Sequence, residues 1–309
     1  MIPARGEPRV LFAKPAPGYR AWPFSNDFTR HLYRAPSSAY PVLTAAIGGE
    51  GVAFYDGVFE PGATLEKLAR LAARFPLVAL GVVSPVTALA TEVQIRAIRK
   101  FAPHTKIVLG GHHPTFYATQ WLERGVDVVV RHEGEATFPE LVERLLDDRD
   151  PAGVRGITWN RDGEIITEPD RDNVPDLNAL PLPDWSPIDF GLYDLGLSPR
   201  GHTGTVETAR GCGHHCSFCV AAAMWRHQQR FKSVERVIAE LQQLHDLGVR
   251  QVMIADDNFG VHRRRDLEIF DYLAETDTTF WAFVRADTVF HDPDWARRVA
   301  KSWPRSATN

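Results

Sequence analysis

All of the cysteines in this 309-residue sequence fall within eight positions. They are Cys212, Cys216 and Cys219, in the spacing Cys-x3-Cys-x2-Cys. A disulfide framework would spread an even number of cysteines along a short secreted chain, so this clustering indicates a metal site. Three thiolates can bind three irons of a four-iron four-sulfur cubane and leave the fourth iron open. An open iron can chelate a small molecule and pass it an electron.

A structural zinc site is the alternative use of these thiolates, with His214 or His215 as the fourth ligand. Structural zinc sites arrange their ligands in two separated pairs and close the tetrahedron. No second pair of cysteines exists in the sequence, which favours the iron–sulfur cluster. The two histidines are then expected to be solvated residues of the cysteine loop.

The cysteine spacing, with Phe218 directly before the last cysteine, resembles the signature of the radical S-adenosylmethionine superfamily. Arg210-Gly211-Cys212, Trp225-Arg226 and Ala255-Asp256-Asp257-Asn258 look like the branch that carries an N-terminal cobalamin-binding domain. Within that branch the chain is similar to the anaerobic magnesium-protoporphyrin monomethyl ester oxidative cyclases, over about Val10 to Lys301.

The resemblance implies a radical enzyme with a four-iron four-sulfur cluster, S-adenosylmethionine and cobalamin as cofactors. Cys212, Cys216 and Cys219 would ligate the cluster, and S-adenosylmethionine would chelate the fourth iron. Its reductive cleavage would give a 5′-deoxyadenosyl radical that abstracts a hydrogen from a small-molecule substrate. The implied reaction is cyclisation with oxidation, or methylation, at an unreactive carbon. An external one-electron reductant such as flavodoxin or ferredoxin is the implied partner.

Asp256, Asp257 and Asn258 follow an expected strand, Gln251 to Ala255. In the family this position meets the ammonium group of S-adenosylmethionine, a role that suits a carboxylate because it pairs with a cation. Turn preferences also allow Asp256 and Asn258 simply to cap a following loop. Arg285, at the end of the next strand, could meet a carboxylate or be solvated, and it is expected to be solvated.

The N-terminal half must position any further cofactor, and there buried strands alternate with helical periods. This pattern predicts a doubly wound parallel α/β sheet. The expected strands are Arg9 to Ala13, Val52 to Tyr55, Leu77 to Val83, Lys106 to Leu109 and Val126 to Val130. The expected helices run from Leu65 to Phe75, from Glu92 to Phe101, and from Phe138 onward with Thr137 as the cap. A long loop is expected from Ala16 to Pro41.

Three loops at the ends of these strands carry candidate cobalamin-binding residues. The candidates are Ser84 after the third strand, Gly110, Gly111 and His112 after the fourth, and Glu133 and Gly134 after the fifth. Ligands of open parallel sheets bind at the carboxyl ends of strands, and glycines let the backbone approach a flat macrocycle. The alternative is that Gly110-Gly111 is only a tight turn and the histidine lies at the surface.

The usual cobalamin motif, Asp-x-His-x-x-Gly, is absent after the first strand. The sequence there is Ala13-Lys14-Pro15-Ala16-Pro17-Gly18, so this loop supplies no histidine to bind cobalt from below. Radical enzymes of this branch commonly lack the motif, and the resemblance therefore still implies cobalamin. A non-catalytic cobalamin-binding or regulatory fragment with an incomplete barrel is the alternative function.

Three segments are expected: a cobalamin-type domain over 1–150, a hairpin and proline-rich linker over 151–200, and a radical S-adenosylmethionine domain over 201–309. The hairpin spans Ile157 to Ile166 and turns at Asp162-Gly163, and Pro175 to Pro187 reads as extended. From Thr205 onward there is room for about three βα units, whereas the family's partial barrel has six. The sequence therefore predicts the first half of a partial (βα) barrel, in a truncated chain expected to turn over substrate poorly.

The remaining strands of this half barrel are expected at Thr205 to Thr208 and at Thr279 to Val284, with helices after Ser233 and over Arg264 to Ala274. Hydrophobic residues make up 44% and charged residues 24% of the sequence, as in ordinary globular proteins. The net charge of −4, without blocks of like charge, gives no indication of nucleic acid or an anionic membrane. With no signal-peptide core and no apolar stretch long enough to span a bilayer, a cytoplasmic protein is expected.

Overall fold

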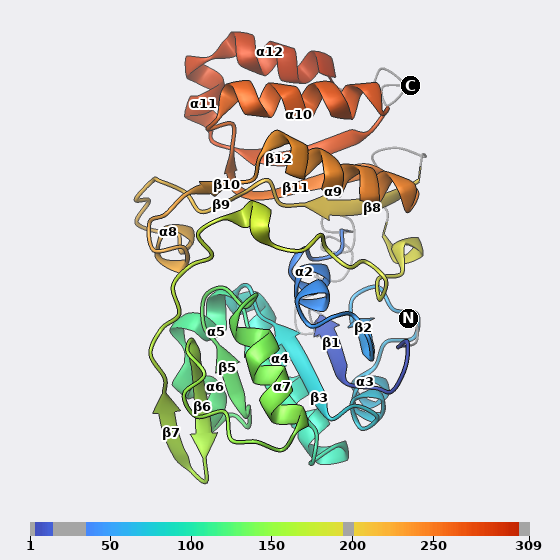
Figure 1. Ribbon diagram of the computed structural model, residues 1–309, viewed down its shortest axis with the longest axis vertical. Helices are drawn as coiled ribbons and strands as arrows, with labels where there is room; N and C mark the ends of the chain where they lie inside the picture. The colour runs from blue at the N-terminus through green and yellow to red at the C-terminus, as the bar shows by residue number, and fades with distance from the viewer. Residues whose placement is uncertain (1–3, 15–34, 194–200, 303–309) are drawn as a thin grey trace. The chain divides into compact units, whose positions relative to one another are not determined.

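The computed structural model describes residues 4–14, 35–193 and 201–302 (Figure 1). The chain divides into two compact units. The first contains the N-terminal strand and Ala39–Val174, and the second contains Pro175–Leu182 and the chain from Phe190 onward. Most of the expected long loop, residues 15–18 of the loop without the cobalamin motif, and residues 303–309 lie outside the described residues.

Five parallel strands form the body of the first sheet, in the order β2-β1-β3-β4-β5. The strands are β1 (Val10–Lys14), β2 (Val52–Asp56), β3 (Leu77–Gly81), β4 (Lys106–Gly110) and β5 (Val128–Val130). The expected doubly wound parallel sheet is confirmed. Sheets with this strand order bind ligands at the carboxyl ends of β1 and β3, where the winding reverses.

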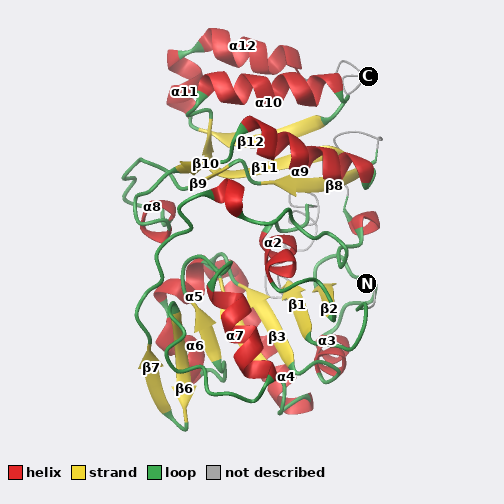
Figure 2. Cartoon of the chain, in the orientation of Figure 1, coloured by secondary structure: helices red, strands yellow, loops and turns green. Residues whose placement is uncertain are grey.

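Helices cover both faces of this sheet (Figure 2). They are α2 (Ala39–Ala46), α3 (Leu65–Ala72), α4 (Pro85–Phe101), α5 (His112–Phe116), α6 (Ala118–Glu123) and α7 (Thr137–Leu146). On one face, α3, α4 and α6 bury Leu68, Ile95 and Trp121 in a core with residues of the sheet. On the other face, the ring of Phe12 lies 5.4 Å from that of Tyr40 in α2 and 5.6 Å from that of Phe138 in α7.

The helices of the first unit differ from expectation at three places. Thr137 is the first residue of α7 and does not cap it, because its hydroxyl donates to the Arg155 carbonyl and accepts from the Arg171 guanidinium. Helix α2 lies where the end of the long loop was expected, and burial of Tyr40, Val42 and Thr44 stabilises it despite its short length. Helix α4 also begins earlier than expected, at Pro85 directly after Ser84.

The expected hairpin is confirmed as β6 (Ile157–Arg161) and β7 (Glu164–Thr167). Its turn residues Asp162 and Gly163 have φ angles of 51° and 99°, as a tight two-residue hairpin turn requires. The hairpin continues the first sheet, because β6 pairs antiparallel with β5. The segment that follows contains the short 3-10 helices η1 (Leu177–Ala179) and η2 (Phe190–Leu192).

The second unit contains a parallel three-stranded sheet in the order β12-β11-β8. Its strands are β8 (His202–Val206), β11 (Val249–Phe259) and β12 (Thr279–Val284), and its helices are α9 (Val234–Asp246), α10 (Arg263–Glu275), α11 (Ala286–His291) and α12 (Pro293–Ser302). As expected, Ser233 caps α9 by accepting from the Arg236 backbone nitrogen. Gly248 ends the same helix with a φ of 82°.

Strand β11 is much longer than expected, and this changes the setting of the acidic motif. It continues through Asp256, Asp257 and Asn258 to Phe259, so these residues do not form a loop after the strand. The pairing of β11 with β12 is irregular between Ile254 and Phe259. Within this stretch Asp256, Asn258 and Phe259 are buried, and Asp257 is exposed.

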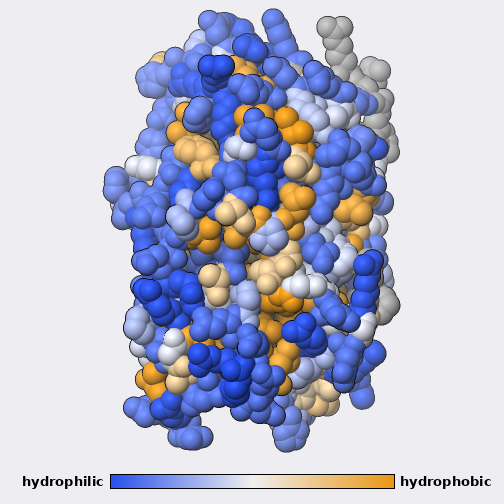
Figure 3. All heavy atoms as spheres, viewed as in Figure 1, coloured by the Kyte–Doolittle hydropathy of each residue, from blue (hydrophilic) through white to orange (hydrophobic). Residues whose placement is uncertain are grey.

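Hydrophilic side chains predominate on the face of the molecule shown in Figure 3. Among the described helices, none is both long enough and apolar enough to cross a membrane.

Candidate functional site

The cysteine loop begins where the chain leaves β8, and a buried carboxylate fixes this corner. Asp256 accepts from the Thr208 backbone nitrogen at 2.6 Å, from the Thr208 hydroxyl at 2.5 Å and from the Ala209 backbone nitrogen at 3.0 Å. Burial raises the pKa of Asp256 to about 7, although these three donors act to lower it. Asp256 therefore serves mainly to hold the start of the loop against β11.

A buried arginine secures the same corner from the side of α10. Arg265 donates to the Thr208 carbonyl at 2.7 Å and to the Thr208 hydroxyl at 3.3 Å. It also pairs with Asp266 at 3.0 Å and donates to the Lys232 carbonyl at 2.8 Å. Thr208 is fully buried, and every one of its polar atoms has a partner among these groups. The point from which the cysteine loop departs is thus rigidly held.

Two very short strands close the base of the loop. Strand β9 (Ala209–Arg210) pairs antiparallel with β10 (Arg230–Phe231), so residues 211–229 project as one excursion that includes the short helix α8 (Ala221–Met224). Gly211 has a φ of 87°, and a Cβ there would lie 1.9 Å from the Gln228 carbonyl oxygen. Only glycine fits at this crossing of the two backbone segments.

The three cysteines follow directly on this excursion. Cys212 and Cys216 are partly buried, Cys219 is exposed, and none of them forms a disulfide. The Cys219 backbone nitrogen donates to the Cys216 carbonyl at 3.1 Å, which curls the loop around its last two cysteines. Among the described residues, no three His, Cys, Asp or Glu side chains gather tightly enough to hold a single metal ion. A cubane does not require such convergence, because each thiolate binds a different iron.

The expectation that Arg285 is solvated is wrong. Its Nε and Nη2 donate to the two carboxylate oxygens of Asp287 at 3.0 Å and 2.6 Å. Its Nη1 lies 3.6 Å from the Cys216 sulfur. These interactions raise the pKa of Arg285 above its usual value, chiefly through the hydrogen bond to Asp287. The end of β12 therefore brings a fixed cation to one of the cysteines.

Asp257 and Asn258 remain available for a ligand beside the loop. Asp257 is exposed and accepts from the Gly211 backbone nitrogen at 3.1 Å. Asn258 is only 4% exposed, and its side-chain oxygen has no hydrogen-bond partner within the described part of the chain. A buried amide oxygen without a donor is unfavourable, so it is a natural partner for an ammonium or hydroxyl donor of a bound molecule.

The histidines of the loop are exposed, as expected. His215 stacks on His227 with ring centroids 4.6 Å apart. The guanidinium groups of Arg210 and Arg230 lie 5.7 Å and 5.9 Å from the ring centre of Trp225, a residue noted from the sequence. Arg210 also pairs with Glu207 at 2.7 Å, and both are largely buried. This stack braces the two strands at the base of the loop.

In the first unit, the candidate cobalamin-binding residues lie at the carboxyl ends of three adjacent strands. Ser84 precedes α4, Gly110 ends β4, and His112 begins α5. Gly111 has a φ of 103°, and a Cβ there would meet the Val82 carbonyl at 2.8 Å, so its conformation is required by the protein itself. At Gly110, by contrast, an added Cβ would meet nothing closer than 3.9 Å.

The loop after β5 is the most firmly built of the three. Glu133 is 7% exposed and accepts from the Val174 backbone nitrogen at 2.6 Å. Gly134 follows it and accepts from the Phe138 backbone nitrogen at 2.7 Å, at the start of α7. The Glu133 side chain therefore ties down the segment that follows the hairpin.

Tyr40 is a residue that the sequence did not single out at this edge. Its hydroxyl donates to the Ala13 carbonyl at 3.1 Å and accepts from the Gly81 backbone nitrogen at 3.2 Å. It thereby joins the ends of β1 and β3 at the point where such sheets bind ligands. Burial raises the pKa of Tyr40 well above its usual value, so the hydroxyl stays protonated. Tyr40 falls within the loop expected from Ala16 to Pro41, so its buried position was not predicted.

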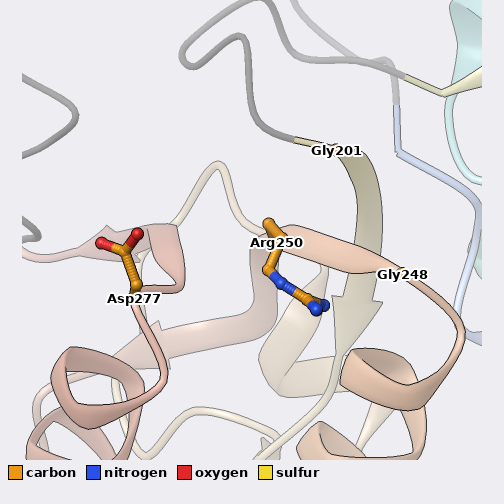
Figure 4. Close-up of a pocket in the computed structure, with 4 residues that line it drawn as sticks. All are labelled: Gly201, Gly248, Arg250 and Asp277. Atoms are coloured by element: carbon orange, nitrogen blue, oxygen red, sulfur yellow. The ribbon is translucent and has the colours of Figure 1, made fainter.

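A shallow pocket of about 280 Å³ lies elsewhere in the second unit (Figure 4). Gly201, Gly248, Arg250 and Asp277 line it. Gly201, Gly248 and Arg250 lie at the amino ends of β8 and β11, and Asp277 precedes β12. The cysteine loop departs from the opposite ends of these strands. The pocket is therefore separate from the candidate site.

Two regions of the chain match known families. Residues 37–142 match the B12 binding domain, and residues 206–305 match the Radical SAM superfamily. Together with the parallel sheets and the cysteine loop, they define a radical S-adenosylmethionine protein with a B12-binding domain. The chain belongs to the cobalamin-dependent radical S-adenosylmethionine enzyme family, whose cofactors include a four-iron four-sulfur cluster and S-adenosylmethionine.

Curated relatives include both methyltransferases and cyclases. An uncharacterized methyltransferase, PH0819 of Pyrococcus horikoshii, is 30% identical over 71% of this chain and 48% of its own length. An anaerobic magnesium-protoporphyrin IX monomethyl ester cyclase of Synechocystis is 29% identical over 82% of this chain and 51% of its own length. The cobalamin-dependent methyltransferase TokK of Streptomyces tokunonensis is 30% identical over 67% of this chain and 31% of its own length. The chain thus spans about half or less of these relatives.

Solved structures share the fold over almost the whole chain. The radical S-adenosylmethionine methyltransferase TsrM of Kitasatospora setae, with cobalamin and a [4Fe-4S] cluster bound, has a TM-score of 0.71 at 19% identity and covers 96% of this chain and 60% of its own. The cobalamin-dependent radical enzyme OxsB, with aqua-cobalamin bound, has a TM-score of 0.68 at 20% identity and covers 96% of this chain and 42% of its own.

Proposed function

We propose that this chain carries the cluster-bearing and cobalamin-binding parts of a radical enzyme that methylates an unreactive carbon of a small molecule. The observation that carries the proposal is the cysteine loop, held by Asp256 and Arg265 at the carboxyl end of a parallel strand. When bound, the cluster supplies the electron that cleaves S-adenosylmethionine, and cobalamin supplies a carrier for the methyl group.

The residues of the second unit divide the work of binding. Cys212, Cys216 and Cys219 ligate three irons, and thiolates are the soft ligands that such clusters require. Asn258 receives the ammonium group of S-adenosylmethionine, with Asp257 as the alternative, because neighbouring residues of a strand face opposite sides of the sheet. The buried, unpartnered oxygen of Asn258 supports this assignment more directly than does Asp256, whose carboxylate already accepts three hydrogen bonds.

Cobalamin binds at the carboxyl edge of the first sheet, with Ser84, Gly110, Gly111, His112, Glu133 and Gly134 nearby. The strand order and the open space above Gly110 support this placement. Glu133 and Gly111 contribute by shaping the loops, since their own contacts are within the protein. An external one-electron reductant such as flavodoxin or ferredoxin supplies the electrons.

A second candidate is radical cyclisation with oxidation. It is favoured by the similarity to the Synechocystis cyclase, which extends over 82% of the chain. Both candidates share the reductive cleavage of S-adenosylmethionine, and they differ in what becomes of the methyl group.

The test is a product assay on the anaerobically reconstituted chain with cobalamin, S-adenosylmethionine and dithionite. Mass spectrometry should detect 5′-deoxyadenosine together with S-adenosylhomocysteine if the chain performs methylation. Formation of 5′-deoxyadenosine without S-adenosylhomocysteine would count against methylation, because the methyl group would then not have left S-adenosylmethionine. Cys216→Ala should form no 5′-deoxyadenosine, and Ser217→Ala, which alters a neighbouring exposed residue, should behave like the natural protein. If the natural chain loads its cluster and still forms neither product, the proposal is wrong.

A further inference from the structure

A cation is fixed beside one of the three cysteines. Arg285 begins the turn between β12 and α11, and its guanidinium lies 3.6 Å from the Cys216 sulfur. Asp287, two residues later, accepts from Nε at 3.0 Å and from Nη2 at 2.6 Å. This fork leaves Nη1 directed at the sulfur. Among the residues that the structure describes, no charged side chain makes such a contact with Cys212 or Cys219.

The ion pair of Arg285 with Asp287 is poorly suited to stabilising the fold. The two side chains are 34% and 44% exposed, and ion pairs that open to solvent contribute little to stability. The two-pronged geometry does, however, determine the direction of the guanidinium. The pair therefore matters mainly for the Cys216 sulfur, which the guanidinium faces.

Hydrogen bonds to the sulfurs and the charge near a cluster set its reduction potential. Reduction adds one electron, so the reduced cluster carries one more negative charge than the oxidised one. A cation and an N–H donor at a ligand sulfur stabilise that added charge. Asp287 offsets part of the charge of Arg285 but lies on the other side of the guanidinium from the sulfur.

We propose that Arg285 is a positioning residue that tunes the cluster, raising its reduction potential through the hydrogen bond to the Cys216 thiolate. Asp287 orients the guanidinium for this contact. The inference rests on the proposed function only in that Cys216 ligates the cluster. Dithionite or an electron-transfer protein supplies the electron, and the cluster takes it up without any bond being made or broken in the protein.

The test is a redox titration of the reconstituted full chain, followed by the paramagnetic resonance signal of the reduced cluster without S-adenosylmethionine. Arg285→Gln should make reduction about tenfold less favourable, which is a shift of about 59 mV to lower potential for one electron. Arg285→Lys keeps the charge but loses the fork, so it should shift the potential less.

Arg263→Gln is the matched control. Arg263 also pairs with an aspartate, Asp292, at 2.6 Å, and it is similarly exposed, but within the described part of the chain it contacts no cysteine. The control should keep the potential of the natural protein. Equal potentials in R285Q and R263Q would overturn the inference. So would loss of the cluster in R285Q alone, because Arg285 would then be needed for assembly. Failure of the natural chain to load any cluster would instead count against the proposed function.

Discussion

Asp256 shows how one buried carboxylate can organise a cofactor loop at an energetic cost. It receives three hydrogen bonds from Thr208 and Ala209, yet burial still raises its pKa to about 7. A raised pKa means that the folded protein prefers the protonated form. The stabilising contribution of Asp256 is therefore complete below its unfolded pKa, near pH 4, and is lost as the pH rises through about 7.

Asp256→Asn should remove this pH dependence, because an amide does not titrate. Between pH 5 and pH 7, the natural protein should lose stability relative to the variant by about 1 kcal/mol per pH unit. The measurement is the free energy of urea unfolding for both proteins at several pH values. Asp246→Asn, at an exposed position of α9, should show no such trend relative to the natural protein. If the difference in unfolding free energy between the natural protein and D256N did not change with pH, the pKa of Asp256 would be the same in the folded and unfolded states. That result would contradict the prediction.

The cysteines make the simplest prediction at this scale. Cys212→Ala, Cys216→Ala and Cys219→Ala should each reduce the iron content of the reconstituted protein from about four atoms per chain to near zero. Iron and sulfide analysis, with the visible absorption of the cluster, checks this outcome. Ser217→Ala should load normally. Unchanged iron in any one cysteine variant would remove that residue from the ligand set.

At the scale of elements, the excursion between β9 and β10 depends on a backbone crossing that no other residue type can make. Gly211 combines a positive φ with a Gln228 carbonyl oxygen 1.9 Å from where a Cβ would lie. An L-residue in the left-handed region costs about 1–2 kcal/mol, and the contact with backbone adds to that cost. The base of the loop must open to accept any side chain.

Gly211→Ala should therefore impair cluster loading, although no ligand is changed. Gly213→Ala is the matched control in the same loop, since its Cβ would meet nothing closer than 3.9 Å and its φ is not in the left-handed region. Iron content after identical reconstitution is the measurement, with thermal unfolding to show that both variants fold. Equal iron content in G211A and G213A would contradict the crossing as the limiting constraint.

At the scale of the whole molecule, the two cofactor regions belong to two units that each have their own sheet and buried core. In the proposed function, cobalamin binds at the edge of the first sheet, and the second unit supplies the cysteine loop. If each cofactor region depends only on the unit that contains it, a change in one unit should leave cofactor binding by the other unit intact.

The variant with all three cysteines replaced by alanine should therefore still bind cobalamin while lacking the cluster. Equilibrium dialysis measures the binding, and paramagnetic resonance of the cobalt(II) form reports the lower ligand. The signal should show no imidazole nitrogen, because the loop after β1 contains no histidine over residues 13–18. A nitrogen hyperfine pattern that changes when the protein's histidines are labelled with nitrogen-15 would mean that a histidine from elsewhere reaches the cobalt. Loss of cobalamin from the triple variant would show that the two regions depend on each other.

The sequence by itself determined the chemistry and the class of fold. The cysteine spacing predicted an iron–sulfur ligand set, because ligand type and spacing are local properties of the chain. The alternation of buried strands with helical periods predicted the parallel sheets, since periodicity reports directly which side of an element is buried. The helix cap at Ser233, the helix end at Gly248 and the hairpin turn at Asp162-Gly163 could also be predicted. Each depends on residues that are close together in the sequence.

Only the tertiary structure decided which polar groups serve the fold and which remain for a ligand. Asp256 and Asn258 look equivalent in the sequence, yet one accepts three hydrogen bonds and the other has none on its oxygen within the described chain. The contact of Arg285 with Cys216 joins residues 69 positions apart. Tyr40 and Gly81 are 41 positions apart. No local pattern encodes such pairs, because they depend on which strands become neighbours when the sheets assemble.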